Sequence, residues 1–99
     1  MTGLEVSFHR LAEAELNDAA AHYEASSLGL GLRFLTEIDR CVQGIIQYPE
    51  AGPVVLGAVR RRLVSRFPYA LLYTQKAGVI RILAIMHLRR TPFYWVGRS

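Results

Sequence analysis

The sequence predicts an α+β fold: an N-terminal strand, a helical hairpin, and then a three-stranded antiparallel meander packed against the helices. Apolar residues recur at every second position near both ends of the chain and at every third or fourth position between residues 10 and 48. These are the periods of strands and helices. Helices that precede a run of consecutive strands are typical of this fold class. The chain has 99 residues, of which 52% are hydrophobic, so we expect a single domain over residues 1–99.

The first quarter of the chain shows the change of period directly. Leu4, Val6 and Phe8 alternate with polar residues, which predicts a half-buried strand. From about residue 10 to residue 25, apolar positions recur at helical spacing and predict an amphipathic helix. The polar positions between them carry Glu13, Glu15, Asp18 and Glu24.

A second amphipathic helix is predicted from about residue 30 to residue 48, after the break "SSLG". Pro49 ends it, because proline cannot continue a helix. Two helices joined by so short a break form an antiparallel hairpin. The residues expected in or near the core are Leu16, Tyr23, Leu35, Ile38, Val42, Leu83 and Ile85, with Cys41 as a buried thiol.

The second half contains three strand-like runs, "AVRRRLVSRF", "YALLYTQ" and "VIRILAIMHL". Pro68 separates the first two runs, and "KAG" is a tight-turn pattern between the second and the third. The third run is apolar on both faces. This pattern predicts a central strand that is covered on both sides or lies under both helices.

The charges are distributed unevenly along the chain. Residues 1–50 contain all eight acidic residues and three arginines, a net charge of −5, whereas residues 51–99 contain nine basic residues and no acidic one, a net charge of +9. A surface of this kind favours an anionic partner, either a nucleic acid or an acidic protein segment.

Four of these basic residues lie in or next to the first strand of the second half. Without a bulge, strand alternation places Arg60, Arg62, Val64 and Arg66 on one face and Val59, Arg61, Leu63 and Phe67 on the other. One interpretation is a basic binding face. The other is a charged edge strand that prevents strand-to-strand aggregation.

The C-terminal segment "HLRRTPFYWVGR" places Arg89, Arg90 and Tyr94 close to Arg81 and His87. Arginines among aromatic residues can bind phosphates and stack on bases. Phe93 and Trp95 are expected to pack in the core, and for Tyr94 the core and the binding role are equally favoured. His87 by itself is more often a structural residue than a base.

The composition excludes several kinds of site and of protein. Residues 51–99 contain no side-chain carboxylate, so a pair of acid and base carboxylates or a Mg²⁺ site near the basic surface would need carboxylates from the helices. We expect no metal and no cofactor. Any cleavage of a phosphodiester would be metal-free and would use arginine, tyrosine and histidine side chains, with guanidinium groups stabilising the transition state. The single cysteine excludes an internal disulfide. No signal sequence and no apolar run of about 20 residues is present, so a cytoplasmic protein without a membrane association is expected.

The chain resembles the RelE/ParE superfamily of toxins from type II toxin–antitoxin modules, and most closely its ParE-like branch. The resemblance covers nearly the whole length. It rests on "VSFHRLAEAELNDAAAHYE", "LGLRFLTEIDRCVQGIIQYPEAGP", "VRRRLVSRFPYALLY" and "IMHLRRTPFYW". The pairing of "RRxLVSRFPYxLLY" with "HxRRxPxYW" at this spacing is its most specific part.

The resemblance implies a growth inhibitor that is neutralised by a cognate antitoxin. In the ribonuclease branch, which cuts messenger RNA on the ribosome, Arg61 and Tyr94 would match functional positions, but Leu63, Ala70 and Leu88 stand where that branch has basic residues. The ParE-like branch acts on DNA gyrase, is not expected to be an enzyme, and fits the sequence better. The alternatives are a metal-free ribonuclease that uses Arg61, Arg81, His87 and Tyr94, and a non-toxic binding module of the same fold.

The expected antitoxin has an acidic, amphipathic C-terminal segment that folds across this domain and adds a strand to the sheet edge. The residues expected to bind the antitoxin or the target are Arg60, Arg62, Arg66, Arg81, Arg89, Arg90 and Tyr94.

Overall fold

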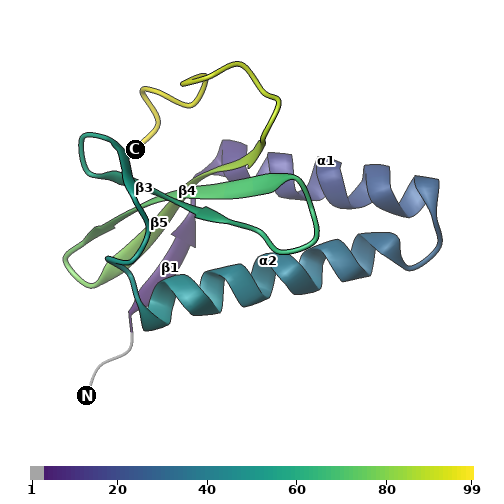
Figure 1. The fold of residues 1–99 in the computed structure, drawn as a ribbon, viewed down its shortest axis with the longest axis horizontal. Helices are drawn as coiled ribbons and strands as arrows, with labels where there is room; N and C mark the ends of the chain where they lie inside the picture. Colours follow the sequence, from purple (N-terminus) through teal and green to yellow (C-terminus); the bar gives the residue numbers. More distant parts are fainter. Residues whose placement is uncertain (1–3) are drawn as a thin grey trace.

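The computed structural model describes residues 4–99, so the first three residues of the predicted domain lie outside it. In chain order the elements are β1 (Glu5–Phe8), α1 (Arg10–Ser26), α2 (Leu30–Gln47), β2 (Val54–Leu56), β3 (Val59–Leu63), β4 (Tyr69–Lys76) and β5 (Val79–His87). The predicted order of one strand, two helices and antiparallel strands is confirmed (Figure 1).

The strands form one mixed sheet in the order β1-β5-β4-β3-β2. Strands β2 to β5 are antiparallel neighbours, and β1 pairs with β5 in parallel. β5 is therefore an interior strand, as its apolar sequence predicted. β2 was not predicted, because an alternation over three residues is too short to distinguish a strand from a loop.

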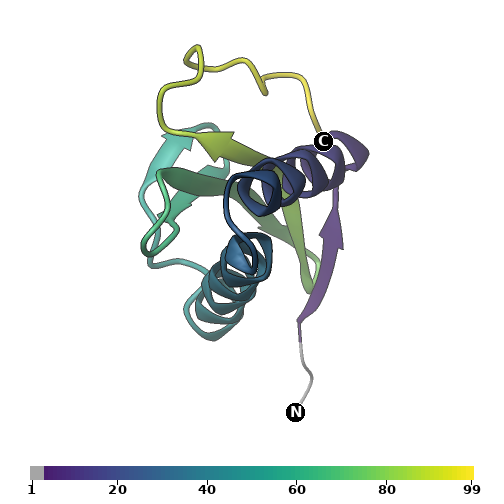
Figure 2. The ribbon, with the colours of Figure 1, turned by 90° about the vertical axis from the view of Figure 1, so that its right-hand side faces the viewer.

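The two helices form a hairpin that covers one face of the sheet (Figure 2). The carboxylate of Glu24 in α1 accepts hydrogen bonds from the backbone N–H groups of Gly29 (2.9 Å) and Gly31 (3.0 Å). A Cβ atom on Gly31 would lie 2.6 Å from the carbonyl oxygen of Ala20, so a larger residue there would push the helices apart. The "SSLG" break thus brings α2 directly against α1.

The main core lies between the hairpin and the sheet. Of the residues predicted for it, Ile38, Val42 and Ile85 are buried in this cluster, and Leu16 and Tyr23 are partly buried against it. Leu83 is buried as well. The prediction for Leu35 was wrong, because its side chain is 38% exposed. Phe34 is fully buried in its place, since successive residues of an α-helix point about 100° apart.

The other face of the sheet is covered by the C-terminal tail, residues 88–99, which arches over it in yellow in Figure 2. Trp95 is buried there against Leu72 and Ala84, which confirms its predicted packing. Phe93 was predicted in the core but is 54% exposed. Its φ of 62° marks a sharp change of chain direction between Thr91 and Tyr94, so its side chain does not follow that of Trp95 into the sheet.

Candidate functional site

The arginines of β3 are divided between the two faces of the sheet. Arg60 lies on the helix side, where its guanidinium donates hydrogen bonds to the carbonyl oxygens of Glu50 (3.0 Å) and Gly52 (2.7 Å). It thereby holds the segment that leads from α2 to β2. Arg61 lies on the tail side, in a depression that Trp95 also lines. The predicted alternation within β3 is confirmed, but the face of Arg60 is not simply exposed to water.

Arg62 extends along the last turns of α2. Its guanidinium lies so close to Gly44 that any Cβ atom there would collide with it. The C-terminal end of a helix carries a partial negative charge, which favours a cation at this place. Cys41, which is buried as predicted, lies on the same side, and burial raises the pKa of its thiol to about 11 although the charge of Arg62 opposes the shift.

Arg66 does not share a strand face with Arg60 and Arg62, contrary to the prediction. It lies beyond the end of β3 with a φ of 71°, a left-handed conformation that breaks the alternation. For the same reason Phe67 does not join the face of Arg61. It packs on the helix side, with ring centroids 5.0 Å from Tyr23 and 5.2 Å from Phe34. Arg66 is left exposed beside α2.

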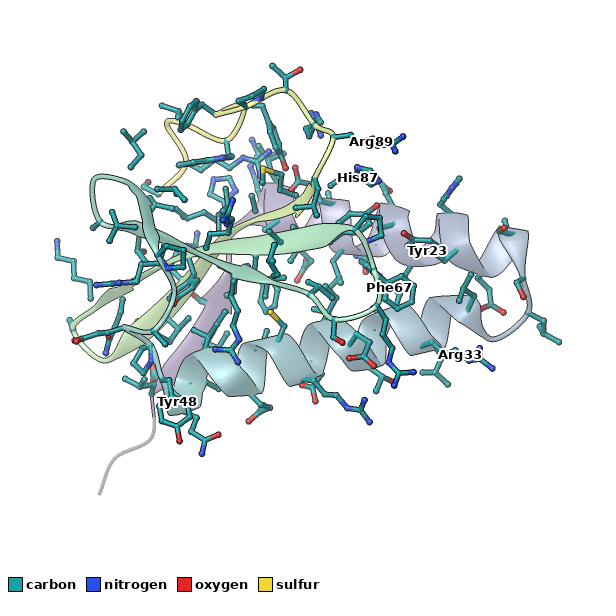
Figure 3. All side chains as sticks on the ribbon, in the orientation of Figure 1. Tyr23, Arg33, Tyr48, Phe67, His87 and Arg89 are labelled. Atoms are coloured by element: carbon teal, nitrogen blue, oxygen red, sulfur yellow. The ribbon has the colours of Figure 1, made fainter. Side chains whose placement is uncertain are left out.

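A groove runs between α2 and the connection from β3 to β4, and we call it the α2 groove. It consists of two adjoining hollows of about 480 and 310 Å³ that share Glu37, Arg40 and Arg66. Leu32, Arg33, Thr36 and Phe67 line one end, and Cys41, Arg62, Leu63 and Ser65 line the other. Figure 3 shows Arg33 on α2 and Phe67 on the connection opposite it.

The α2 groove is strongly basic and partly apolar. Four guanidinium groups line it, from Arg33, Arg40, Arg62 and Arg66, and its one carboxylate, Glu37, already pairs with Arg40 at 3.0 Å. Arg33 and Arg40 were missed from the sequence. Their spacing of seven residues on α2, with Glu37 between them, could have shown that they lie on the same side of the helix.

An unpaired strand edge adjoins the groove. β2 pairs only with Val59 and Arg60 of β3, so within residues 4–99 no strand lies beside the Arg62–Leu63 end. The Leu63 side chain is also exposed there. An extended peptide can add to an edge of this kind by backbone hydrogen bonds.

The tail is held by Glu15 of α1, which the sequence pattern had placed on the polar side of the helix. The carboxylate accepts hydrogen bonds from the backbone N–H of Ile85 (3.0 Å), the hydroxyl of Tyr94 (2.8 Å) and, at both oxygens, the guanidinium of Arg98 (3.0 Å each). The Glu15 and Arg98 side chains are only 17% and 12% exposed. Nothing in the sequence indicates this contact, because 83 residues separate the two partners.

The remaining predicted residues lie around the tail. Arg81 donates to the hydroxyl oxygen of Ser7 (3.1 Å) and to the backbone oxygen of Ser99 (3.4 Å). His87 accepts a hydrogen bond at Nδ1 from the backbone N–H of Arg89 and packs edge-on against Tyr69. Arg89 and Arg90 are exposed, and the guanidinium carbon of Arg90 lies 3.9 Å above the ring of Tyr94.

The predicted nuclease residues are not brought together. Arg61, Arg81 and His87 line three different hollows. Burial raises the pKa of Tyr94, and its hydrogen bond to Glu15 raises this pKa further, so the hydroxyl keeps its proton at neutral pH.

Among residues 4–99, no three His, Cys, Asp or Glu side chains are arranged to hold a metal ion. In the same range, no helix is long and apolar enough to cross a bilayer.

Comparison with known proteins identifies the family. The family model described as the ParE toxin of type II toxin–antitoxin system, parDE, matches residues 6–92. A solved chain from the chromosomal ParDE toxin–antitoxin system of P. aeruginosa superposes with a TM-score of 0.73 at 24% sequence identity, over 87% of this chain and 97% of that one. This likeness shows the ParE-like fold. A comparison with curated protein sequences gives no significant match. Since the family model covers most of its length, the chain belongs to the ParE toxin family of type II toxin–antitoxin systems.

Proposed function

We propose that this ParE-family toxin stops growth by acting on DNA gyrase as a binding protein and that it does not cut RNA. The gyrase target is proposed from the match to the ParE toxin family, and the observation that argues against RNA cleavage is the separation of Arg61, Arg81 and His87 into different hollows. Electrostatic catalysis on a phosphodiester needs its charged and proton-transferring groups around one reacting centre. The hydroxyl of Tyr94 already donates a hydrogen bond to the carboxylate of Glu15. The proposed target places the action of the toxin in the cytoplasm.

The proposal includes a cognate antitoxin whose C-terminal segment is disordered when free and binds in the α2 groove. An acidic, amphipathic segment fits this groove, since its apolar side chains can pack against Leu30, Leu32 and Phe67 while its carboxylates meet Arg62 and Arg66. On the side of β3 away from β4, no strand of residues 4–99 lies beside Leu63. The Leu63 carbonyl accepts a weak hydrogen bond from the Cys41 thiol (3.7 Å), but an extended segment can still add to β3 there by backbone hydrogen bonds. Its match to a parDE family supports a partner of this kind.

This proposal revises the predicted binding set. Arg60 and Arg81 already donate their hydrogen bonds within the chain, and we assign them a structural role. Arg62 and Arg66 are assigned to the antitoxin. Arg89, Arg90 and Tyr94 lie at the tail and are not part of the α2 groove.

The test is expression of the toxin alone, followed by two measurements. We expect growth arrest, no codon-phased cleavage of messages by primer extension, and inhibition of DNA supercoiling when purified toxin is added to purified gyrase. Codon-phased cuts within translated regions would overturn the proposal in favour of the ribonuclease. Unimpaired growth with full expression of folded protein would instead identify a non-toxic binding module.

A further inference from the structure

The tail side of the sheet carries a second surface, separate from the α2 groove. Its centre is a shallow depression of about 170 Å³. Leu72 and Trp95 line it and are buried, and Arg61 and Phe93 line it as well. We call this surface the tail face. The depression is almost entirely apolar apart from Arg61, and it lies on the face of the sheet opposite the helices.

Phe93 is held in a costly backbone conformation. Its φ is 62°, in the left-handed region that bulky side chains rarely adopt. The same tail has glycine at its other left-handed position, Gly97. Burial does not offset the strain at Phe93, because the residue is 54% exposed and its ring lies tilted at 53° to that of Trp95, with 6.0 Å between the ring centroids. Strain that maintains an exposed aromatic side chain is typical of a binding site.

The charges around the tail face restrict what can bind it. Arg61, Arg89 and Arg90 are basic, and residues 51–99 contain no side-chain carboxylate. Of the carboxylates on α1, Glu15 is fully engaged with Arg98, Tyr94 and Ile85, and Asp18 lines a different hollow, which Arg90 also lines. A second copy docked through this face would bring arginines against arginines, which disfavours a dimer. The charges instead complement a different protein that presents carboxylates next to an apolar side chain.

We propose that the tail face is the surface through which the toxin contacts its target, by Phe93 inserting into an apolar site and Arg61 pairing with a carboxylate. This inference rests on the proposed function, because it requires a target. Phe93 is exposed and Arg61 is half-buried, and aromatic and arginine side chains around an apolar centre are enriched in protein interfaces. Leu63 lies on the strand face of Arg61 and also lines the α2 groove, so a segment bound in the groove reaches the border of the tail face.

The experiment compares Phe93→Ser and Arg61→Gln with the control Val96→Ser. Val96 is a matched control, because it is an apolar tail residue that is 52% exposed and does not line the depression. Each protein is expressed without antitoxin to measure growth arrest, and is purified to measure its melting temperature and its affinity for the cognate antitoxin. We expect Phe93→Ser and Arg61→Gln each to need about tenfold more toxin for the same arrest. Melting temperature and antitoxin affinity should stay close to wild type, and Val96→Ser should match wild type in all three.

The other outcomes separate this inference from the proposed function. If the wild type arrests growth by inhibiting gyrase and both variants arrest it equally well, the tail face is not the target surface, while the proposed function stands. If the variants lose antitoxin affinity together with toxicity, the face binds the antitoxin and the inference is wrong. If the wild type causes no arrest, the proposed function fails, and this inference fails with it.

Discussion

The two faces of the sheet are stabilised in different ways. On the helix side, α1 and α2 enclose the main core, in which Phe34, Ile45 and Ile80 are fully buried. On the tail side, the buried cluster is smaller and centres on Leu72, Ala84 and Trp95, and the covering tail consists of tight turns held by the carboxylate of Glu15. Each fully buried large apolar side chain contributes about 1.5–3 kcal/mol, so the helix side carries most of the stability. The tail side can therefore loosen without unfolding the domain.

The largest expected loss of stability comes from a substitution in the core on the helix side. Phe34→Ala should lower the free energy of unfolding by about 3–5 kcal/mol, because it leaves a cavity at a fully buried position. This is a large share of the 5–15 kcal/mol typical of a domain. Leu35→Ala is the neighbouring control and should cost much less, since Leu35 is 38% exposed. Chemical denaturation measures both, and an equal loss for the two variants would contradict the placement of the core.

The next largest loss of stability is expected from a substitution that weakens the attachment of the tail. Glu15→Gln keeps the shape of the side chain but removes the charge that Arg98 pairs with in a largely buried position. We expect a cost of about 1–3 kcal/mol and a looser tail. Trp95 is the only tryptophan, so its fluorescence should shift to longer wavelength while the helical circular dichroism stays unchanged. Glu13→Gln, at an exposed position of the same helix, should change neither signal. A loss of helix and of tail structure together would show that the two sides are not separable.

Much of the helix side could be predicted from the sequence, and much of the tail side could not. Alternation and helical spacing report which side of an element is apolar, and they located β1, both helices, β4 and β5. They do not report which polar side chain meets a distant segment, so Glu15 was placed toward water. They also assume regular backbone, which fails where Arg66 and Phe93 take positive φ values. The sequence identified the arginines of β3 but not their roles. Arg60 binds backbone carbonyl groups, Arg62 lines the α2 groove and Arg61 lies on the tail face, and only the structure shows these contacts.

A smaller expected effect is a pH dependence of the free energy of unfolding, which comes from Cys41 on the helix side. The thiol of Cys41 has an ordinary pKa of 9.0, and burial raises it to about 11 in the folded chain. Between these values the unfolded chain loses the proton and the folded chain keeps it. The stability from this group is therefore complete below about pH 9 and is lost as the pH rises to about 11, about 3 kcal/mol in all. Cys41→Ala should lose stability less steeply over this range in denaturation measured at several pH values. Identical slopes would show that the thiol is not shielded.

The most direct test of the division between the two sides is antitoxin binding by two matched double variants. Arg33→Glu with Arg66→Glu reverses two exposed charges of the α2 groove, and Arg89→Glu with Arg90→Glu reverses two exposed charges of the tail. Both change the net charge equally, so a difference between them reports local contacts and not the overall field. Surface plasmon resonance at several salt concentrations measures the association rate. The groove variant should associate about tenfold more slowly and with a weaker salt dependence, and the tail variant should stay much closer to wild type. Equal slowing by both variants, or slowing by the tail variant alone, would contradict an antitoxin site in the α2 groove.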